Sequence, residues 1–99
     1  NIYPAEIENC LIAHPAVADV AVFGLPDPEM GQFVQAVVQP AAGAEPSPEL
    51  VEELREYVRA NLAAFKVPRE IAFRAELPRM PTGKLRKGPL RDEFLAARG

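Results

Sequence analysis

Apolar residues recur every three or four positions in three segments of the chain, which is the spacing of an amphipathic helix. The first segment begins at Pro4, a residue favoured at the first position of a helix, and is ended by Pro15. The second begins at Pro48, directly after a serine that can cap a helix. The third begins at Gly88 and Pro89. The buried faces of these predicted helices are Ile7, Cys10, Leu11 and His14; Leu50, Leu54, Tyr57, Val58 and Leu62; and Leu90, Phe94 and Leu95.

Three shorter segments, Val17 to Phe23, Phe33 to Gln39 and Ile71 to Arg74, predict strands because they are rich in β-branched and aromatic residues. Gly24 is expected to end the first, and the residues after it, L-P-D-P-E-M-G-Q, are expected to form a loop. A connection of this length suits an antiparallel pair but not a tight hairpin. The order α-β-β-α-β-α predicts an α+β domain, with a three-stranded, mainly antiparallel sheet covered by about three helices.

The segment from Leu77 to Lys87, L-P-R-M-P-T-G-K-L-R-K, lies between the last predicted strand and the last predicted helix. Its two prolines favour extended backbone, and Gly83 permits a conformation that is costly for other residues. Lys84 follows directly and carries a compact positive charge on a flexible stem. The residues alone leave two interpretations open: a solvated basic loop, or a held loop that delivers this charge into another site.

The size of the chain limits what it can do. With 99 residues, of which 48% are hydrophobic, it is expected to form one small domain with little room for a deep active site of its own. A helper domain or a binding module is therefore favoured over a complete enzyme. The first residue is Asn rather than Met, which suggests a piece of a longer protein.

Cysteine content and hydropathy favour the cytoplasm. The single cysteine, Cys10, excludes an internal disulfide, and Cys10 with His14 is too small a set for a four-ligand zinc site, so no metal is expected. No apolar run approaches the length of about 18 residues that a membrane span needs, and no signal segment opens the chain.

The net charge of −3 conceals a strong asymmetry along the chain. Residues 1–65 carry a net charge of −8, whereas residues 66–91 carry +6. Such a basic segment suits an anionic cofactor, an acidic partner or a nucleic acid. Nucleic acid is not favoured, because the segment has few aromatic residues and the acidic remainder would repel a phosphate backbone.

Four motifs, in this order, resemble the C-terminal domain of the adenylate-forming enzymes. They are N-I-Y-P-A-E-I-E at the start, H-P-A-V-A-D-V-A-V-F-G-L-P-D, F-K-V-P, and L-P-R-M-P-T-G-K-L-R-K. The superfamily contains acyl-CoA synthetases, adenylation domains of nonribosomal peptide synthetases and firefly luciferase, and the chain is most similar to an acyl- or aryl-CoA ligase. The resemblance covers essentially all of residues 1–99, and four ordered motifs are specific where one would be weak.

The resemblance implies a two-step reaction in which Lys84 is the catalytic lysine. A carboxylate attacks the α-phosphate of ATP to give an acyl-adenylate and pyrophosphate, and the thiol of coenzyme A then displaces AMP. The mobile C-terminal domain brings Lys84, held by Gly83, into the active site of the enzyme's own large N-terminal domain, where Gly83 is also expected to take part in cofactor binding. The expected substrates are a carboxylic acid, ATP with Mg²⁺ bound elsewhere, and CoA; residues 1–99 alone are expected to be inactive and to bind no cofactor.

The resemblance also implies that Phe65 and Lys66 of F-K-V-P lie near the CoA channel. The helical pattern before Phe65 leaves a second interpretation open, in which its ring is ordinary core. Two positions depart from the family pattern: Gln32 replaces a frequent Glu, and Lys87 replaces a common Arg, so a bidentate contact at that position is in doubt. The family's hinge residue and glycine-rich loop would precede Asn1.

Two other functions remain open, together with one form of regulation. The chain could belong to an adenylation domain that loads a carrier protein, or be a non-catalytic anion-binding module that uses residues 66–91. The pattern P-x-x-x-x-G-K, from Pro78 to Lys84, also resembles the sequence that acetyltransferases of such ligases recognise, so Lys84 is a candidate for acetylation. The acyl substrate is not readable, because the resemblance places its pocket in the N-terminal domain.

Overall fold

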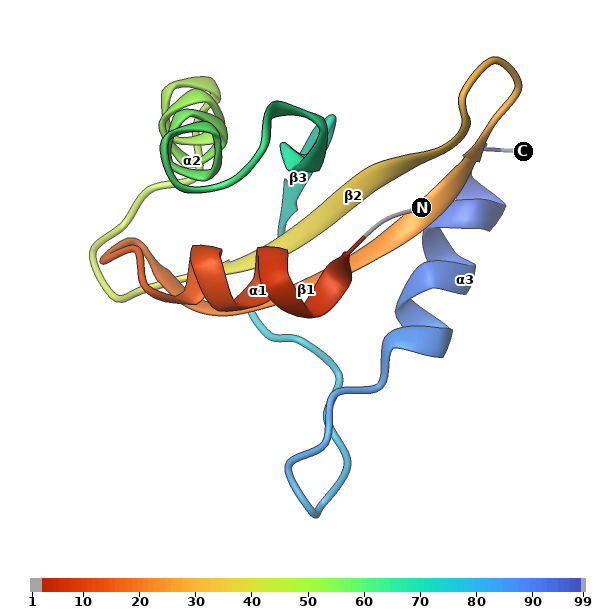
Figure 1. Cartoon of the computed structure of the whole chain (residues 1–99). Coiled ribbons are helices and arrows are strands. Elements are labelled where there is room, and N and C mark those ends of the chain that lie inside the picture. Colours follow the sequence, from red (N-terminus) through yellow and green to blue (C-terminus); the bar gives the residue numbers. More distant parts are fainter. Residues whose placement is uncertain (1–2, 99) are drawn as a thin grey trace.

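A computed structural model describes residues 3–98, and the predicted order α-β-β-α-β-α is confirmed (Figure 1). The first two residues of the N-I-Y-P motif lie outside the described residues. A short 3₁₀ helix, η1, follows the second α-helix. The elements are α1 (Pro4–Ile12), β1 (Val17–Asp27), β2 (Gly31–Pro40), α2 (Pro48–Asn61), η1 (Ala64–Lys66), β3 (Glu70–Phe73) and α3 (Lys87–Arg98).

The helices begin close to where the sequence predicts. In α2, the Ser47 hydroxyl oxygen accepts a hydrogen bond from the backbone N–H of Leu50 at 3.0 Å, so the expected cap is formed. Helix α3 begins at Lys87, one residue before the predicted start. His14 follows the end of α1 and is buried, with its Nε2 2.8 Å from a Glu53 carboxylate oxygen. None of the helices within residues 3–98 has the length and apolar character needed to cross a membrane.

The sheet has the order β1-β2-β3, with β2 in the middle. Strands β1 and β2 pair antiparallel along nearly their whole length, from Val17 opposite Pro40 to Asp27 opposite Gly31. The shorter β3 pairs parallel with β2, so the sheet is mixed while its longer ladder is antiparallel. The helix α2 provides the crossover that a parallel neighbour requires.

The connection between β1 and β2 is a tight hairpin of three residues, 28–30, so the expectations of a strand end at Gly24 and of a long loop are wrong. Strand β1 tolerates Pro26 because it lies at the edge of the sheet, where a missing N–H need not break a ladder. Gly31 takes the positive φ of 84° that a short turn requires. The Asp27 carboxylate accepts hydrogen bonds from Arg69 and from the backbone N–H of Met30, and these bonds lower the pKa of Asp27.

Both faces of the β1–β2 ladder are buried. On one face, alternate residues of both strands pack against α1 and α2; on the other, the intervening residues pack against α3 and the segment before it. Cys10 lies half-buried at the first of these layers, and burial raises the pKa of its thiol. The first layer contains Val20, Val22, Val34, Ala36, Val38, Ile7, Leu11, Leu50, Leu54 and Val58, and the second contains Ala21, Phe23, Leu25, Phe33, Val37, Leu77 and Leu90.

Truncation of Leu54 to alanine is expected to lower the free energy of unfolding by about 2 to 5 kcal/mol, because this side chain is fully buried between α2 and the sheet. Ile12→Ala is the matched control, since Ile12 is 45% exposed and its truncation is expected to cost less than about 1 kcal/mol. Urea unfolding of the chain, followed by circular dichroism, measures both. Equal losses for the two variants would contradict the assignment of Leu54 to the core.

Candidate functional site

The segment of residues 77–87, called the lysine loop from here on, folds as a small hairpin. The backbone N–H of Gly83 donates to the Met80 carbonyl at 2.7 Å, and the N–H of Met80 donates to the Lys84 carbonyl at 2.8 Å. Nearer the base, Arg86 N–H donates to the Pro78 carbonyl at 2.8 Å. This pattern is a three-residue hairpin loop, so Lys84 leaves a hydrogen-bonded turn rather than a free coil.

The conformation of the turn explains its glycine. Gly83 has a φ of 92°, in a region where side chains with a Cβ are strained. Apart from the two neighbouring residues, a Cβ at this position would meet no atom of residues 3–98 within 4 Å, so the constraint is the backbone angle and not a lack of space. The predicted role of Gly83 in shaping the loop is therefore confirmed, whereas its contact with a substrate stays a prediction.

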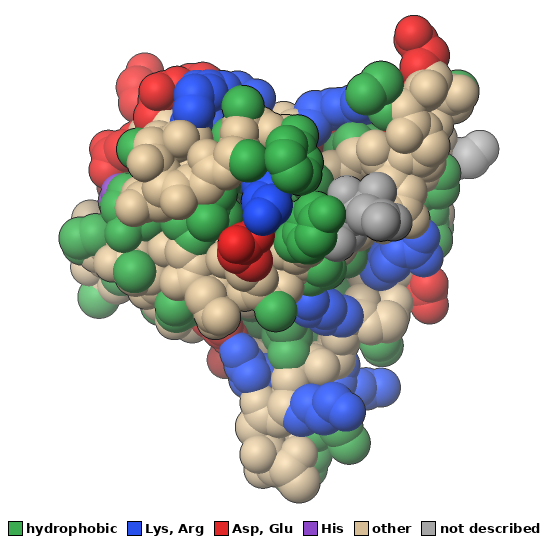
Figure 2. Space-filling view, viewed as in Figure 1, with side chains coloured by type: hydrophobic (Ala, Val, Ile, Leu, Met, Phe, Trp, Pro, Cys, Tyr) green, Lys and Arg blue, Asp and Glu red, His purple; other side chains and the backbone are tan. Residues whose placement is uncertain are grey.

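The two sides of the lysine loop differ in burial. Leu77 is buried, and Leu85 packs half-buried against the layer that contains Leu90 of α3. Lys84 is exposed, and no ion pair or hydrogen bond joins its side chain to another described residue. Figure 1 shows the loop extending away from the rest of the domain, and Figure 2 shows Lys and Arg side chains gathered on this projection. An apolar base thus holds a loop whose lysine faces outward.

Two ion pairs connect the lysine loop to the N-terminal half of the chain. Arg79 donates from Nε and Nη2 to the two carboxylate oxygens of Asp19 in β1, at 2.8 and 2.6 Å, and from Nη1 to the Gly83 carbonyl oxygen. The hydrogen bonds to Asp19 raise the pKa of the Arg79 guanidinium. Lys87 Nζ lies 2.6 Å from the Glu8 carboxylate, which also accepts from the backbone N–H of Val22 at 2.8 Å.

The sequence pattern does not identify these anchoring residues as a group. Arg79 stands inside the motif that was singled out, and Asp19 is the only charge in the predicted strand Val17 to Phe23. These are the two features of the sequence that point to Arg79 and Asp19. Nothing in the sequence connects the two residues, because they are sixty positions apart in the chain.

Phe65 is 68% exposed, so the interpretation of its ring as ordinary core is wrong. The helical pattern does not continue to this residue, because α2 ends at Asn61 and Leu62 has an extended backbone, with φ −132° and ψ 174°. The ring makes an edge contact with Tyr3, with centroids 6.1 Å apart. Phe65 is therefore available to a partner or ligand.

Lys66 is held by an ion pair with Glu6 of α1, and its Nζ lies 4.5 Å from the centroid of the Tyr3 ring and 5.6 Å from that of Phe65. These are cation–π distances. The sequence pattern does not single out Tyr3, although it belongs to the N-I-Y-P motif. Tyr3 of the first motif thus contacts Phe65 and Lys66 of F-K-V-P in the folded domain.

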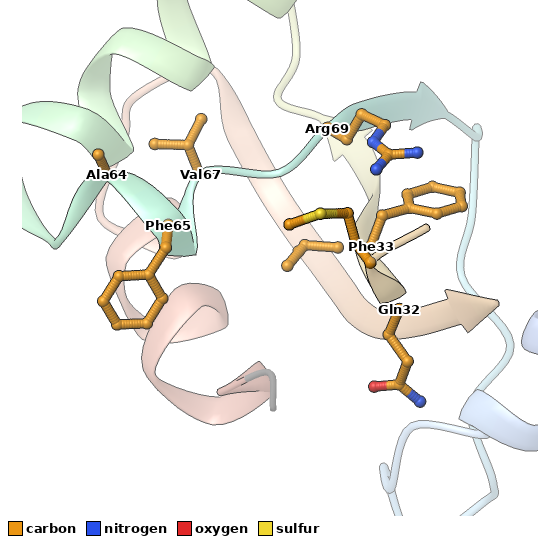
Figure 3. Close-up of a pocket in the computed structure, with 8 residues that line it drawn as sticks. Gln32, Phe33, Ala64, Phe65, Val67 and Arg69 are labelled. Carbon is orange, nitrogen blue, oxygen red and sulfur yellow. The ribbon is translucent and has the colours of Figure 1, made fainter. Parts of the chain in front are cut away.

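A groove lies between η1 and the β1–β2 hairpin (Figure 3). Phe65 projects from the η1 side, and Phe33 and Arg69 lie across the groove from it. The Arg69 guanidinium is 4.5 Å from the centroid of the Phe33 ring and also pairs with Asp27. Gln32, where the family often has Glu, lines the same groove. An aromatic surface beside a guanidinium suits a ligand that has both an apolar and an anionic part.

The structure does not bring the two groups of predicted site residues together. In Figure 1 the tip of the lysine loop projects below the rest of the domain, whereas η1 lies above α1, between α2 and β3. Lys84 is therefore separate from Phe65 and Lys66. In residues 3–98, no group of three or more His, Cys, Asp or Glu side chains is placed to hold a metal ion.

Most of the basic segment is neutralised within the domain. Among the described residues, five of its eight cations pair with carboxylates, and four of those carboxylates belong to the acidic residues 1–65. The charge asymmetry of the sequence thus becomes a set of contacts between the two halves of the chain. The five pairs are Lys66–Glu6, Arg69–Asp27, Arg74–Glu93, Arg79–Asp19 and Lys87–Glu8.

Curated proteins with similar sequences are much longer than this chain. A fatty acid–acyl-carrier-protein ligase of Streptomyces coeruleorubidus is 45% identical over 95% of the chain, which corresponds to 18% of its own length. The acetyl-coenzyme A synthetase of Bacillus subtilis is 42% identical over 92% of the chain and 16% of its own length. The chain thus spans less than a fifth of the length of these relatives.

Solved structures agree with the sequence relatives. An acyl-CoA synthetase of Brucella canis superposes with a TM-score of 0.93 at 43% identity, over 97% of this chain and 18% of that one. ATP-bound MatB of Rhodopseudomonas palustris superposes with a TM-score of 0.86 at 33% identity, over 100% of this chain and 19% of that one. The family model described as AMP-binding enzyme C-terminal domain matches residues 6–84. The chain therefore belongs to the family of AMP-binding enzyme C-terminal domains.

Proposed function

We propose that residues 1–99 are the mobile C-terminal lid domain of a cytoplasmic, ATP-dependent, AMP-forming ligase that joins a carboxylic acid to CoA. The observation that carries the proposal is Lys84, which stands exposed on a hydrogen-bonded turn at the end of a projecting loop. Family membership supports it, as does the greater length of the relatives, which leaves room for a large N-terminal domain with a hinge. The ATP and carboxylate sites, and Mg²⁺ with the ATP, belong to that large domain.

In this proposal Lys84 supplies positive charge during adenylate formation. A carboxylate and a triphosphate repel each other as they approach, and negative charge develops on the oxygens around the α-phosphate. A cation held between them lowers the barrier, because it is already oriented when the charge develops. The turn around Gly83 reduces the freedom of the backbone that carries Lys84. The lysine stem then supplies the remaining reach.

The second half-reaction uses a different part of the domain. η1, which carries Phe65 and Lys66, lies apart from the projecting tip of the lysine loop in Figure 1, so both regions cannot occupy one small active site in the same orientation. Rotation of the domain between the two steps resolves this, with Lys84 docked for adenylation and the F-K-V-P side docked for thioester formation. The exposed Phe65 ring and the Arg69 guanidinium across the groove suit the apolar and phosphate parts of CoA.

A carrier-protein acceptor is the second candidate function, because the Streptomyces coeruleorubidus relative is a fatty acid–acyl-carrier-protein ligase. An autonomous anion-binding module has less support. Such a module needs free positive charge, whereas five cations of the basic segment pair with carboxylates within residues 3–98.

In the full-length enzyme, Lys84→Ala is expected to slow adenylate formation by about a hundredfold to a thousandfold, the usual effect of losing one preorganised donor. Thioester formation from a preformed acyl-adenylate is expected to stay near wild type. Pyrophosphate exchange measures the first half-reaction, and CoA consumption measures the second. Arg59→Ala is the control, because it removes an exposed cation from α2 without touching the loop. Equal loss of both half-reactions would contradict the role of Lys84.

Free CoA is expected to be turned over by the full-length enzyme, and Phe65→Leu is expected to raise the KM for CoA while leaving pyrophosphate exchange unchanged. Leucine removes the exposed aromatic ring that is proposed to contact CoA. The rest of the domain is unaffected, because Phe65 is not part of the core. Steady-state kinetics with CoA, and in parallel with a phosphopantetheinylated carrier protein, measure both effects. Strict dependence on the carrier protein would favour the second candidate function.

Acetylation of Lys84 is proposed as a means of control, since it would remove the charge that adenylation needs. The exposed position of Lys84 allows an acetyltransferase to reach it, whereas Lys87 is engaged with Glu8. Incubation with a ligase-specific acetyltransferase and acetyl-CoA, followed by peptide mass spectrometry, is expected to find acetyl groups on Lys84 in preference to Lys87. An unmodified Lys84 in that experiment would count against this form of control.

A further inference from the structure

We propose that Arg79 and Asp19 act together as positioning residues for Lys84. The proposal rests on the adenylation role of Lys84 described above and adds to it a device that fixes the direction in which the lysine loop points. Neither residue is proposed to touch a substrate.

The geometry of Arg79 is what supports this role. Two of its donors bind the two oxygens of Asp19, at 2.8 and 2.6 Å, in the bidentate arrangement that a planar guanidinium permits. A third donor, Nη1, binds the carbonyl oxygen of Gly83. That carbonyl belongs to the peptide bond that leads into Lys84. One side chain thus connects a strand of the sheet directly to the backbone that carries the lysine.

The elements that Arg79 joins differ in rigidity. Asp19 lies in β1, a strand held along its length by β2 and packed against α1. Within residues 3–98, the tip of the lysine loop is held by its own hairpin hydrogen bonds, by the isolated bridge between Arg79 and Leu85, and by the half-buried Leu85 side chain. Those bonds fix the shape of the turn but not its orientation relative to the sheet. The pair with Asp19 supplies that orientation.

A purely stabilising role explains the arrangement less well. The side chain of Arg79 is 41% exposed and that of Asp19 is 19% exposed, so even this bidentate pair contributes less to the free energy of unfolding than the apolar burial of the core does. The base of the loop is held independently by the burial of Leu77 and by Lys87 with Glu8. Loss of the Arg79 pair is therefore expected to leave the domain folded and the loop attached, but with its tip free to change direction.

The test uses Arg79→Lys, Asp19→Asn and the double variant in the full-length enzyme. Each single variant is expected to lower the kcat of pyrophosphate exchange by about tenfold to a hundredfold, the range expected when a catalytic group is misplaced. The KM values for ATP and for the acid are expected to change little, and thioester formation from preformed acyl-adenylate is expected to be unaffected. The double variant is expected to resemble the singles, because both changes break the same pair.

Two controls separate positioning from charge and from stability. Arg74→Lys removes the guanidinium of an arginine whose side chain is 38% exposed, similar to that of Arg79. Arg74 pairs with Glu93 away from the loop, so this variant is expected to behave as wild type. Hydrogen exchange of the loop amides is expected to become faster in Arg79→Lys and Asp19→Asn, with the thermal unfolding midpoint almost unchanged. If Arg79 instead acted on ATP through its charge, Asp19→Asn would leave adenylation intact.

The outcomes distinguish this proposal from the proposed function. Wild-type pyrophosphate exchange in Asp19→Asn, or equal losses in both half-reactions, would overturn the positioning role while leaving the Lys84→Ala result as it stands. Failure of Lys84→Ala to separate the half-reactions would overturn the proposed function itself. Additive losses in the double variant would show that Arg79 and Asp19 act separately, and would also overturn the proposal that they act as a pair.

Discussion

Burial of both faces of the β1–β2 ladder is the constraint on which the rest of the structure depends. Residues 20–25 and 33–38 are buried without interruption, so each face of the ladder needs its own cover. Helices α1 and α2 cover one face, and α3 with the base of the lysine loop covers the other. Because Leu77 and Leu85 belong to the second cover, the position of the lysine loop follows from completing the core.

Charge pairing then sets the details that apolar burial leaves free. Hydrophobic contacts are not directional, whereas a guanidinium and a carboxylate meet in few geometries. Four acidic residues from the first part of the chain bind cations from the basic part, at η1, at the hairpin and at both sides of the lysine loop. The exposed Lys84 stands apart from this pairing. The acidic half of the domain thus orients the basic half and leaves charge available at one projecting tip.

The sequence predicts what depends on neighbours in the chain and misses what depends on distant partners. Helix starts at Pro4 and Pro48 were found because caps and prolines act locally. Gly24 was mistaken for a strand end because its pairing with β2 cannot be seen from local propensity. The direction of β3 and the pairing of Arg79 with Asp19 required the folded chain. The motif that contains Lys84 was identifiable by resemblance, but its anchoring was not.

The bond between Arg79 and Asp19 also bears on protein engineering. A designer who transplants residues 77–87 onto another scaffold would carry over the turn, its glycine and its lysine, because their hydrogen bonds are internal. The orientation of the loop would not be transferred, because Arg79 binds the carboxylate of Asp19, which belongs to β1. The smallest portable unit is therefore the loop together with its strand. A chimaera whose junction lies between β1 and the lysine loop must therefore keep both Asp19 and Arg79.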